Sequence, residues 1–381
     1  MRSKYRILSP SICNVRTLFK VSGLALVAPI ASVALASPFW SPDDTKTPID
    51  SSKVCRVADK ALTNNPSLNI EGKYWDTAFT SLGKALSTAR CKEVWIKQGT
   101  YDTSLWHDDD GVTIQAGTTV WGGFYGNDAQ DNLYKQSPSA TILDGDRYAY
   151  HTVTLKGDVQ RDTVISNLTI SGGQADGSSS KDYDKGGGLY CSGDSTQACS
   201  PTIIDVYFER NEANAEGGAV YMTSRKDVSP LFSGSTRFWK NESGGNGGAL
   251  AIRSGLGSNA QPEIEHARFY GNTADEKGGA IYTYAFASPV FTKISHTEFT
   301  NNQAASGSAI FQQHFSFLGN SHNHTELSFS SVDGSAFTAP IRGSSKTVTS
   351  ITSSYSYFNT PFGSTPLSQF HTLNINATFT P

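Results

Sequence analysis

The stretch GGAVYMTSRKDVSPLFSGSTRFWKNESGGNGGALAI, residues 217–252, begins and ends with nearly the same phrase. Gly-Gly-Ala and an aliphatic residue start at Gly217 and return at Gly247, 30 residues later. Between the two copies stands the short run Phe-Trp-Lys-Asn, residues 238–241. A phrase that returns at a fixed spacing is typical of repeat proteins.

Two phrases recur along the chain with one common period. The Gly phrase returns at intervals of 31, 30, 31 and 29 residues, and a Phe-x-x-Asn phrase returns at intervals of 30, 31 and 30. Copies of the Gly phrase begin at Gly186, Gly217, Gly247, Gly278 and Gly307. The Phe-x-x-Asn copies are Phe208/Asn211, Phe238/Asn241, Phe269/Asn272 and Phe299/Asn302. Because two different phrases stay in phase, the region is built from repeats of about 30 residues.

The runs between these marks are too short for amphipathic helices and have the alternation of strands. Examples are TIIDVYF, AVYM and ALAI. A single unit of this size cannot bury its apolar side chains alone, whereas stacked units can, with each strand pairing to its equivalent about 4.8 Å away. The sequence therefore predicts an all-β parallel β-helix, a solenoid with about 30 residues per repeat.

The alternation of side chains along each strand predicts which columns face inward. The aliphatic and phenylalanine columns should be buried, and the asparagines should form a ladder whose amides bond from coil to coil. The expected aliphatic column is Leu189, Val220, Leu250, Ile281 and Ile310. The small residues before it should face outward, as should the aromatic column after it. Those small residues are Gly188, Ala219, Ala249, Ala280 and Ala309.

Alternating GGA(I/V/L) and FxxN phrases resemble the repeats of the chlamydial polymorphic outer-membrane proteins. They are also similar to those of other bacterial surface proteins with a right-handed parallel β-helix of the pectin-lyase-like fold. The specific phrases cover about residues 160–311. The resemblance implies a right-handed coil and an exported, surface-located protein.

The segments outside the repeats suggest a domain organisation. We expect a signal peptide at 1–36, an N-terminal extension at 37–72, a capping helix at 73–91, the β-helix at 92–318 and a Ser/Thr-rich C-terminal β segment or cap at 319–381. Within the cap, Ala78, Phe79, Leu82 and Leu86 would share one face of a helix from Trp75 to Ala89. Such a helix would cover the open end of the solenoid.

The first 36 residues have the pattern of a secretory signal. Five basic residues and no acidic ones precede or flank the apolar run VSGLALVAPIASVALA, and Ala34-Leu35-Ala36 fits a cleavage site. An N-terminal membrane anchor is the alternative. No other apolar run approaches about 18 residues, so we expect no integral membrane segment in the mature chain. We expect a secreted or cell-surface protein, with periplasmic retention as the other possibility.

The net charge and the cysteines fit this compartment. Loss of residues 1–36 changes the formal net charge from −3 to −8, which argues against nucleic acid as a partner. Four cysteines would remain, and an even number in an exported chain suggests two disulfides. Of the three possible pairings, we predict Cys55 with Cys91 and Cys191 with Cys199.

The outward aromatic column is the first candidate binding site. It consists of Tyr190, Tyr221, Tyr282 and Phe311, with Ala251 in the middle. Aromatic faces stack on sugar rings, so the column could be a glycan platform. Alternatively, these rings stack on one another or lie under a loop, and stiffen the solenoid.

An enzyme is the second hypothesis. A polysaccharide lyase of this fold needs a basic residue beside a uronate and a cation such as Ca²⁺. The catalytic candidates are Lys185, Arg225, Arg253, Asp182 and Asp184. Asp144 and Asp146, on a Gly-containing loop, are the calcium candidates, and no other cofactor is expected. The alternative for each acid is a solvated loop residue.

We therefore expect an exported surface or adhesion-type protein whose outward face binds a polysaccharide or a host surface protein. The alternative is a polysaccharide lyase, or a glycoside hydrolase with two acids in a cleft, acting on an acidic polysaccharide.

Overall fold

The structure is a computed structural model. It describes residues 51–60, 71–104, 111–127, 137–286 and 290–315, together with the strands between 322 and 375. The chain divides into two compact units, Met1–Thr45 and Lys46–Pro381, and every described residue belongs to the second.

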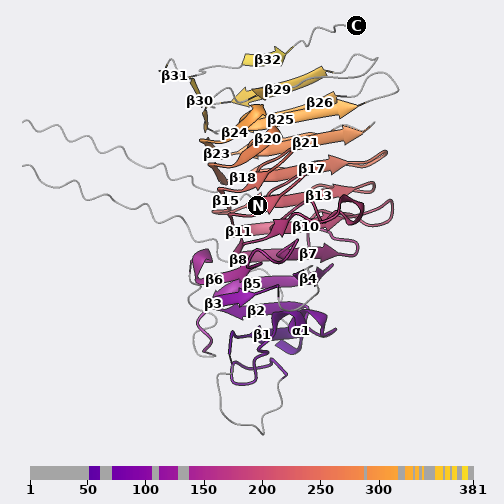
Figure 1. The fold of residues 1–381 in the computed structure, drawn as a ribbon, viewed down its shortest axis with the longest axis vertical. Helices are drawn as coiled ribbons and strands as arrows, with labels where there is room; N and C mark the ends of the chain where they lie inside the picture. Colours follow the sequence, from indigo (N-terminus) through magenta and orange to yellow (C-terminus); the bar gives the residue numbers. More distant parts are fainter. Residues whose placement is uncertain are drawn as a thin grey trace, which may run out of the picture. The chain divides into compact units, whose positions relative to one another are not determined.

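The described chain is almost entirely β-structure, arranged in three sheets (Figure 1). In each repeat the chain passes through the three sheets in turn. Strands of successive repeats pair in parallel within each sheet. The second sheet comprises β4 (Val112–Gln115), β7 (Val153–Lys156), β10 (Leu189–Ser192), β13 (Val220–Ser224), β17 (Leu250–Ser254), β21 (Ile281–Phe286), β25 (Ile310–Phe315) and β28 (Phe337–Thr338). The third comprises β9 (Gln174–Ala175), β12 (Glu212–Ala213), β16 (Glu242–Ser243), β20 (Thr273–Lys277) and β24 (Gln303–Ser306).

The first sheet is the largest. Its first strands are β1 (Val54–Val57), β2 (Glu93–Lys97), β3 (Gly99–Asp102), β5 (Thr119–Phe124), β6 (Thr141–Asp144), β8 (Val164–Ser171) and β11 (Thr202–Glu209). It continues through β14 (Leu231–Ser233), β15 (Arg237–Trp239), β18 (Glu263–Glu265), β19 (Arg268–Tyr270), β22 (Phe291–Ser295) and β23 (Glu298–Thr300). The last strands are β26 (His322–Ser328), β27 (Ser331–Asp333), β29 (Val348–Ser354), β30 (Tyr357–Thr360), β31 (Gly363–Pro366) and β32 (His371–Ile375). The parallel sheets fit a β-helix or solenoid, as the repeats predict.

The two inward columns are confirmed. Leu189, Val220, Leu250, Ile281 and Ile310 are register partners on successive strands of the second sheet and are at most 1% exposed. The phenyl rings of Phe208, Phe238, Phe269 and Phe299 stack with centroids 4.9, 4.4 and 4.9 Å apart. Full burial of one such side chain stabilises the fold by about 1.5–3 kcal/mol.

The asparagine ladder is also confirmed. Each side-chain amide donates to the Oδ1 of the next asparagine, at 3.1 Å from Asn211 to Asn241 and 2.9 Å from Asn241 to Asn272. The bond from Asn272 to Asn302 is also 2.9 Å. The amides of Asn241, Asn272 and Asn302 also donate to the backbone carbonyls of Phe208, Phe238 and Phe269, and the amide of Asn211 donates to that of Ile170.

The Gly phrase turns the chain into the second sheet. Its first glycine has a positive φ, for example 65° at Gly217. A Cβ on Gly218 would lie 2.2 Å from the carbonyl oxygen of Glu242, because the neighbouring coil passes very close. The prediction that the next small residue faces outward is wrong: Ala219, like its equivalents Ala249, Ala280 and Ala309, packs in the main core. The amides of Ala219 and Val220 both donate to the Ala249 carbonyl, so the chain bends here and does not alternate.

The N-terminal cap is much less helical than predicted. Only α1 (Leu82–Ser87) forms, in place of a helix over 73–91. The Phe79 N–H instead donates to the Arg56 carbonyl, and the Phe79 carbonyl accepts from the Ala58 N–H, each at 2.9 Å. The apolar residues of the predicted face, including Leu82 and Leu86, are nevertheless buried. β1, inside the predicted N-terminal extension, pairs in parallel with β2. Among the described residues, short 3₁₀ turns lie at Ser51–Lys53, Pro138–Ala140 and Ser179–Lys181.

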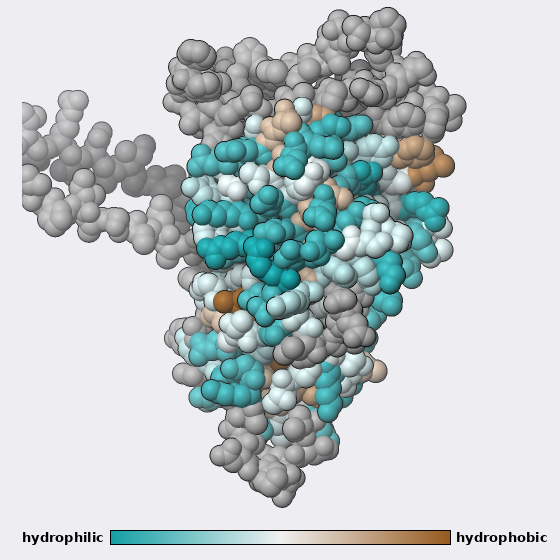
Figure 2. Space-filling view, viewed as in Figure 1, coloured by the Kyte–Doolittle hydropathy of each residue, from teal (hydrophilic) through white to brown (hydrophobic). Residues whose placement is uncertain are grey.

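In the first sheet, the pairing of strands changes from parallel to partly antiparallel after the repeats. β26 and β27 continue the parallel stack, but β29 pairs antiparallel with β32 and β30 antiparallel with β31. Across the described residues, no helix is long and apolar enough to cross a membrane. The face seen in Figure 2 is mostly hydrophilic where residues are described.

Candidate binding cleft over the aromatic column

The aromatic column is in register along the second sheet. Tyr190, Tyr221, Ala251, Tyr282 and Phe311 are successive partners on β10, β13, β17, β21 and β25. The rings of Tyr190 and Tyr221 are stacked at 5.9 Å, and those of Tyr282 and Phe311 at 6.0 Å. Ala251 leaves a gap between the two pairs.

The prediction of an exposed aromatic platform is wrong for three of the four rings. Tyr221 is 5% exposed, Tyr282 2% and Phe311 0%, and only Tyr190 is half-buried. The alternative, rings under a loop, describes them better. The residues that precede each Gly phrase, Lys185, Glu216, Asn246 and Lys277, form backbone bridges from coil to coil. Lys185 Nζ lies 5.5 Å from the Tyr221 ring centre and Lys277 Nζ 5.3 Å from that of Phe311.

A partly buried ion pair, between Arg253 and Glu216, lies beside the gap at Ala251. Arg253 donates to both carboxylate oxygens of Glu216, whose side chain is 6% exposed. Asn246 Nδ2 also donates to Glu216 Oε1, at 3.1 Å. The Arg253 guanidinium lies 4.8 Å from the ring centre of Tyr284. Burial acts to lower the pKa of Arg253, but the hydrogen bonds and charge of Glu216 outweigh it and raise the pKa above its ordinary value. Arg253 is thus held as a cation.

The other candidate acids and base meet at the N-terminal end of the column. Lys185 Nζ lies 2.5 Å from Asp182 Oδ1 and 3.9 Å from Asp184, while Tyr190 Oη donates to Asp182 Oδ2 at 2.8 Å. Burial tends to raise the pKa of Asp182, but the bonds from Lys185 and Tyr190 prevail and lower it. The pKa of Tyr190 and that of Tyr221 are both raised, mainly because the two hydroxyl groups are buried. Three of the catalytic candidates from the sequence, Asp182, Asp184 and Lys185, therefore lie together in the structure.

An open cleft of about 420 Å³ lies beside Tyr221 and the Glu216–Arg253 pair. It is lined by Lys185, Asn214, Ala215, Glu216, Tyr221, Gly244, Gly245, Asn246, Arg253 and Glu276. Its wall therefore combines one aromatic ring with two cations and two carboxylates. The Oδ1 atom of Asn246 is buried and accepts no hydrogen bond from the described residues.

Sequence reasoning missed Glu216, Asn246 and Glu276. A usable signal for the first two was their position directly before the Gly phrase, which is occupied in turn by Lys185, Glu216, Asn246, Lys277 and Ser306. In the sequence alone, this position is indistinguishable from an ordinary loop position. Its role becomes visible only when the coils are placed side by side.

Two further predicted sites do not join the cleft. Arg225 lies at the end of β13 beside the disulfide loop, where it contributes to lowering the pKa of Asp194. Asp144 and Asp146 share a turn in which Asp146 N–H donates to Asp144 Oδ1 at 3.1 Å. Nowhere in the described ranges do three His, Cys, Asp or Glu residues gather as a metal site would require. Calcium binding at Asp144 and Asp146 stays a prediction.

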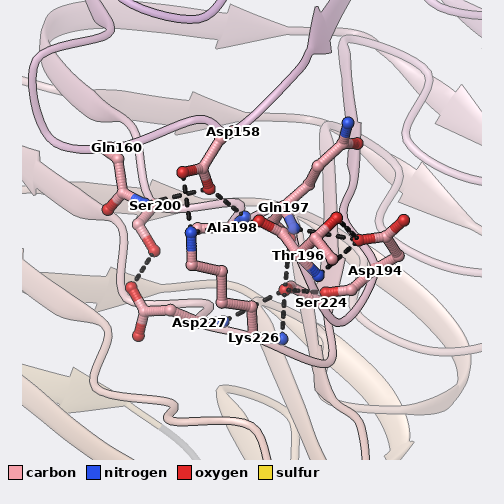
Figure 3. Close-up of polar contacts among 10 residues, drawn as sticks. All are labelled: Asp158, Gln160, Asp194, Thr196, Gln197, Ala198, Ser200, Ser224, Lys226 and Asp227. Atoms are coloured by element: carbon pink, nitrogen blue, oxygen red, sulfur yellow. Dashed lines mark hydrogen bonds and ion pairs between the residues drawn. The ribbon is translucent and has the colours of Figure 1, made fainter.

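Both predicted disulfides form, Cys55–Cys91 and Cys191–Cys199. The second closes a loop that a polar network ties to its neighbours (Figure 3). Asp158 accepts from Ala198 N and Lys226 Nζ, each at 2.7 Å, and Ser224 Oγ donates to the Gln197 carbonyl at 2.9 Å. These bonds bind the loop to the coils on either side of it, so we assign the network a structural role.

Comparison with known proteins adds one match. The model of the Chlamydia polymorphic membrane protein (Chlamydia_PMP) repeat matches residues 267–284. This segment holds Phe269, Asn272 and the Gly phrase at Gly278, all of which are structural here. No curated protein and no solved structure matches the chain significantly. The match links the repeat to a family of surface proteins, and the disulfides fit an exported protein.

Proposed function

We propose that the chain is an exported surface protein whose coils form a right-handed parallel β-helix and whose cleft over the aromatic column binds a glycan. The match to the Chlamydia polymorphic membrane protein repeat and the two disulfides support export and surface location. The signal-like segment 1–36 supports the route.

The composition of the cleft carries the glycan proposal. Sugar rings present an apolar face and a rim of hydroxyl groups, so their sites combine an aromatic ring with a few placed polar groups. The cleft is lined by Tyr221, by the Glu216–Arg253 pair and by Asn246, whose Oδ1 accepts no hydrogen bond from the described residues. Its volume of about 420 Å³ lies within the range of ordinary small-ligand sites.

Glycan binding is favoured over lyase chemistry because both candidate bases of the site, Arg253 and Lys185, are held in ion pairs. A general base must lose its proton near neutral pH. Arg253 is paired with Glu216 and Lys185 with Asp182, so neither basic group is free to act as the base. The same pairs suit a site that holds hydroxyl groups in fixed positions.

The experiment is a glycan array, followed by calorimetry, with the purified chain and the variant Asn214→Trp. Asn214 is exposed at the edge of the cleft, so an indole there should fill it without disturbing the core. Leu256→Trp is the matched control, because Leu256 is 64% exposed on another loop. Asn214→Trp should abolish retention of the glycans that the wild type and control retain. Equal retention by both variants would refute the cleft as the site.

Export has a separate test. If residues 1–36 are a signal peptide, the N-terminal sequence of the protein recovered outside the cytoplasm should begin at Ser37. Recovery of the chain with an intact Met1 from the cytoplasm would contradict export.

A further inference from the structure

The outer face of the first sheet carries a second cluster of aromatic and basic side chains. Along β11, β15 and β19 the residues flanking the buried phenylalanines point outward. Tyr207, Arg237 and Arg268 are register partners, and Glu209, Trp239 and Tyr270 are the adjacent set. Tyr270 is 42% exposed, and Trp239 is half-buried. We call these residues, with Arg210 and Lys240, the Trp239 face.

Three cations surround the indole of Trp239. The guanidinium of Arg210 lies 4.8 Å from its ring centre, Lys240 Nζ 5.0 Å and the guanidinium of Arg237 5.8 Å. Arg237 is neutralised by an ion pair with Glu209. Within the described part of the chain, Arg210 and Lys240 form no ion pair, and both are exposed. Two uncompensated positive charges therefore flank one aromatic ring.

The backbone at these two cations is left-handed, as it is at eight other described non-glycine residues. Arg210 and Lys240 have φ values of 53° and 52°, in the left-handed region. The next two coils place Gly271 and Asn301 at the same corner, residue types that tolerate this conformation. The preceding coil has Gly172 at this corner, so only the two coils between Gly172 and Gly271 use long basic residues there. The cost of this conformation at two adjacent positions points to a function for the charges.

We propose that the Trp239 face binds an acidic sugar residue of a polysaccharide, with its carboxylate between Arg210 and Lys240 and its ring against Trp239 and Tyr270. A carboxylate would relieve the repulsion between the two cations and accept charge-assisted hydrogen bonds from both. The apolar face of a sugar ring complements the indole. This site is separate from the cleft and goes beyond the function proposed for it.

Neighbouring carboxylates limit the negative charge of the ligands that the Trp239 face can bind. Around the corner on the third sheet, Glu212 pairs with Arg147 at 2.7 Å, while the Glu242 side chain is exposed. Glu298 lies one coil beyond Arg268, within 3.6 Å of it. These carboxylates would repel a densely sulfated chain, so the face fits a sugar with a single acidic group at this point.

The test measures binding of the full chain to oligogalacturonate, a hyaluronan oligosaccharide and sialyllactose. The matched neutral probes are the methyl esters of these sugars and lactose. At least one acid probe should bind, its neutral partner should not, and the affinity should fall as salt is added. Failure of every acid probe, or equal binding of an acid and its neutral partner, would overturn the proposal.

Variants assign the binding to residues. Arg210→Asn and Lys240→Asn remove each charge but install the residue that Asn301 already provides at this corner, so both should fold at least as stably as the wild type. Each should lower the affinity about tenfold or more. Arg225→Asn, an exposed arginine at the end of β13, should change nothing. Unchanged affinity in both corner variants would also overturn the proposal.

The cleft variant separates the two sites. Asn214→Trp should leave binding of the acid probe intact, because Asn214 lines the cleft and takes no part in the Trp239 face. If Asn214→Trp abolishes this binding while the corner variants do not, the acid binds in the cleft and the Trp239 face is refuted.

Discussion

Asn241 shows how one side chain can fix the corner of a coil. Its amide nitrogen donates to the Phe208 carbonyl and to Asn272, and its Oδ1 accepts from the backbone and side chain of Asn211. All of these groups are buried, so none can turn to water instead. The identity of the residue is therefore dictated by its neighbours above and below.

We predict that Asn241→Ala lowers the free energy of unfolding by about 3 kcal/mol or more. The change removes four buried hydrogen bonds and leaves the backbone amide of Asn211 without its acceptor, an unsatisfied group that alone costs about 1–3 kcal/mol. Chemical denaturation measures the effect, with the exposed Asn214→Ala as control. A loss similar to that of the control would mean that the ladder does not hold the coils together.

Asp182 should make stability depend on acid. Burial disfavours its charge, but Lys185 and Tyr190 lower the pKa below its unfolded value of about 3.9. Its contribution is therefore complete above about pH 4 and is lost as the pH falls through the lower, folded pKa. Thermal melts from pH 2 to 6 should show a shallower acid decline for Asp182→Asn than for the wild type. Parallel declines would exclude this role.

At the scale of elements, sequence pattern and structure agree where one repeat constrains the next. The aliphatic, phenylalanine and asparagine columns follow from spacing alone. The cap does not, because backbone pairing of Phe79 with Arg56 and Ala58 replaces a helix that the apolar spacing favours. Likewise, alternation places Tyr221 outside the main core but says nothing of the Lys185–Glu216–Asn246 bridges that cover it. Covering is a tertiary property that local pattern does not encode.

The two disulfides should differ in their effect on stability. Closing a loop of 36 residues is worth about 4 kcal/mol and one of 8 residues about 2.5 kcal/mol in the chain-entropy estimate. The short loop is also held by Asp158 and Ser224. Replacing Cys55 and Cys91 by Ser should therefore lower the melting temperature more than replacing Cys191 and Cys199. The reverse order would show that the disulfide loop, and not the N-terminal coil, limits stability.

At the scale of the molecule, the stack of coils separates support from function. The glycines, phenylalanines and asparagines that define the two phrases serve packing, bonding or turning, which is why their spacing could be read from the sequence. The cleft and the Trp239 face are built from residues of successive coils. These residues are about one repeat apart in the sequence and meet only when the coils stack. Glu216 and Arg253, for example, are 37 residues apart. No local pattern marks such pairs.

The parallel register of one repeat is the claim on which both proposed sites depend. Double cysteine variants test it, in a Cys13→Ser background that leaves the two native disulfides in place. Arg237 and Arg268 are register partners on adjacent strands, so their Cα atoms should be about 4.8 Å apart, within disulfide range. Arg237 and Glu298 are two strands apart, too far for a disulfide.

Under mild oxidation, Arg237→Cys with Arg268→Cys should form an intramolecular disulfide, measured by mass spectrometry of the proteolysed chain. Arg237→Cys with Glu298→Cys should not. Cross-linking of the second pair and not the first would contradict the stacked register and, with it, both the cleft and the Trp239 face.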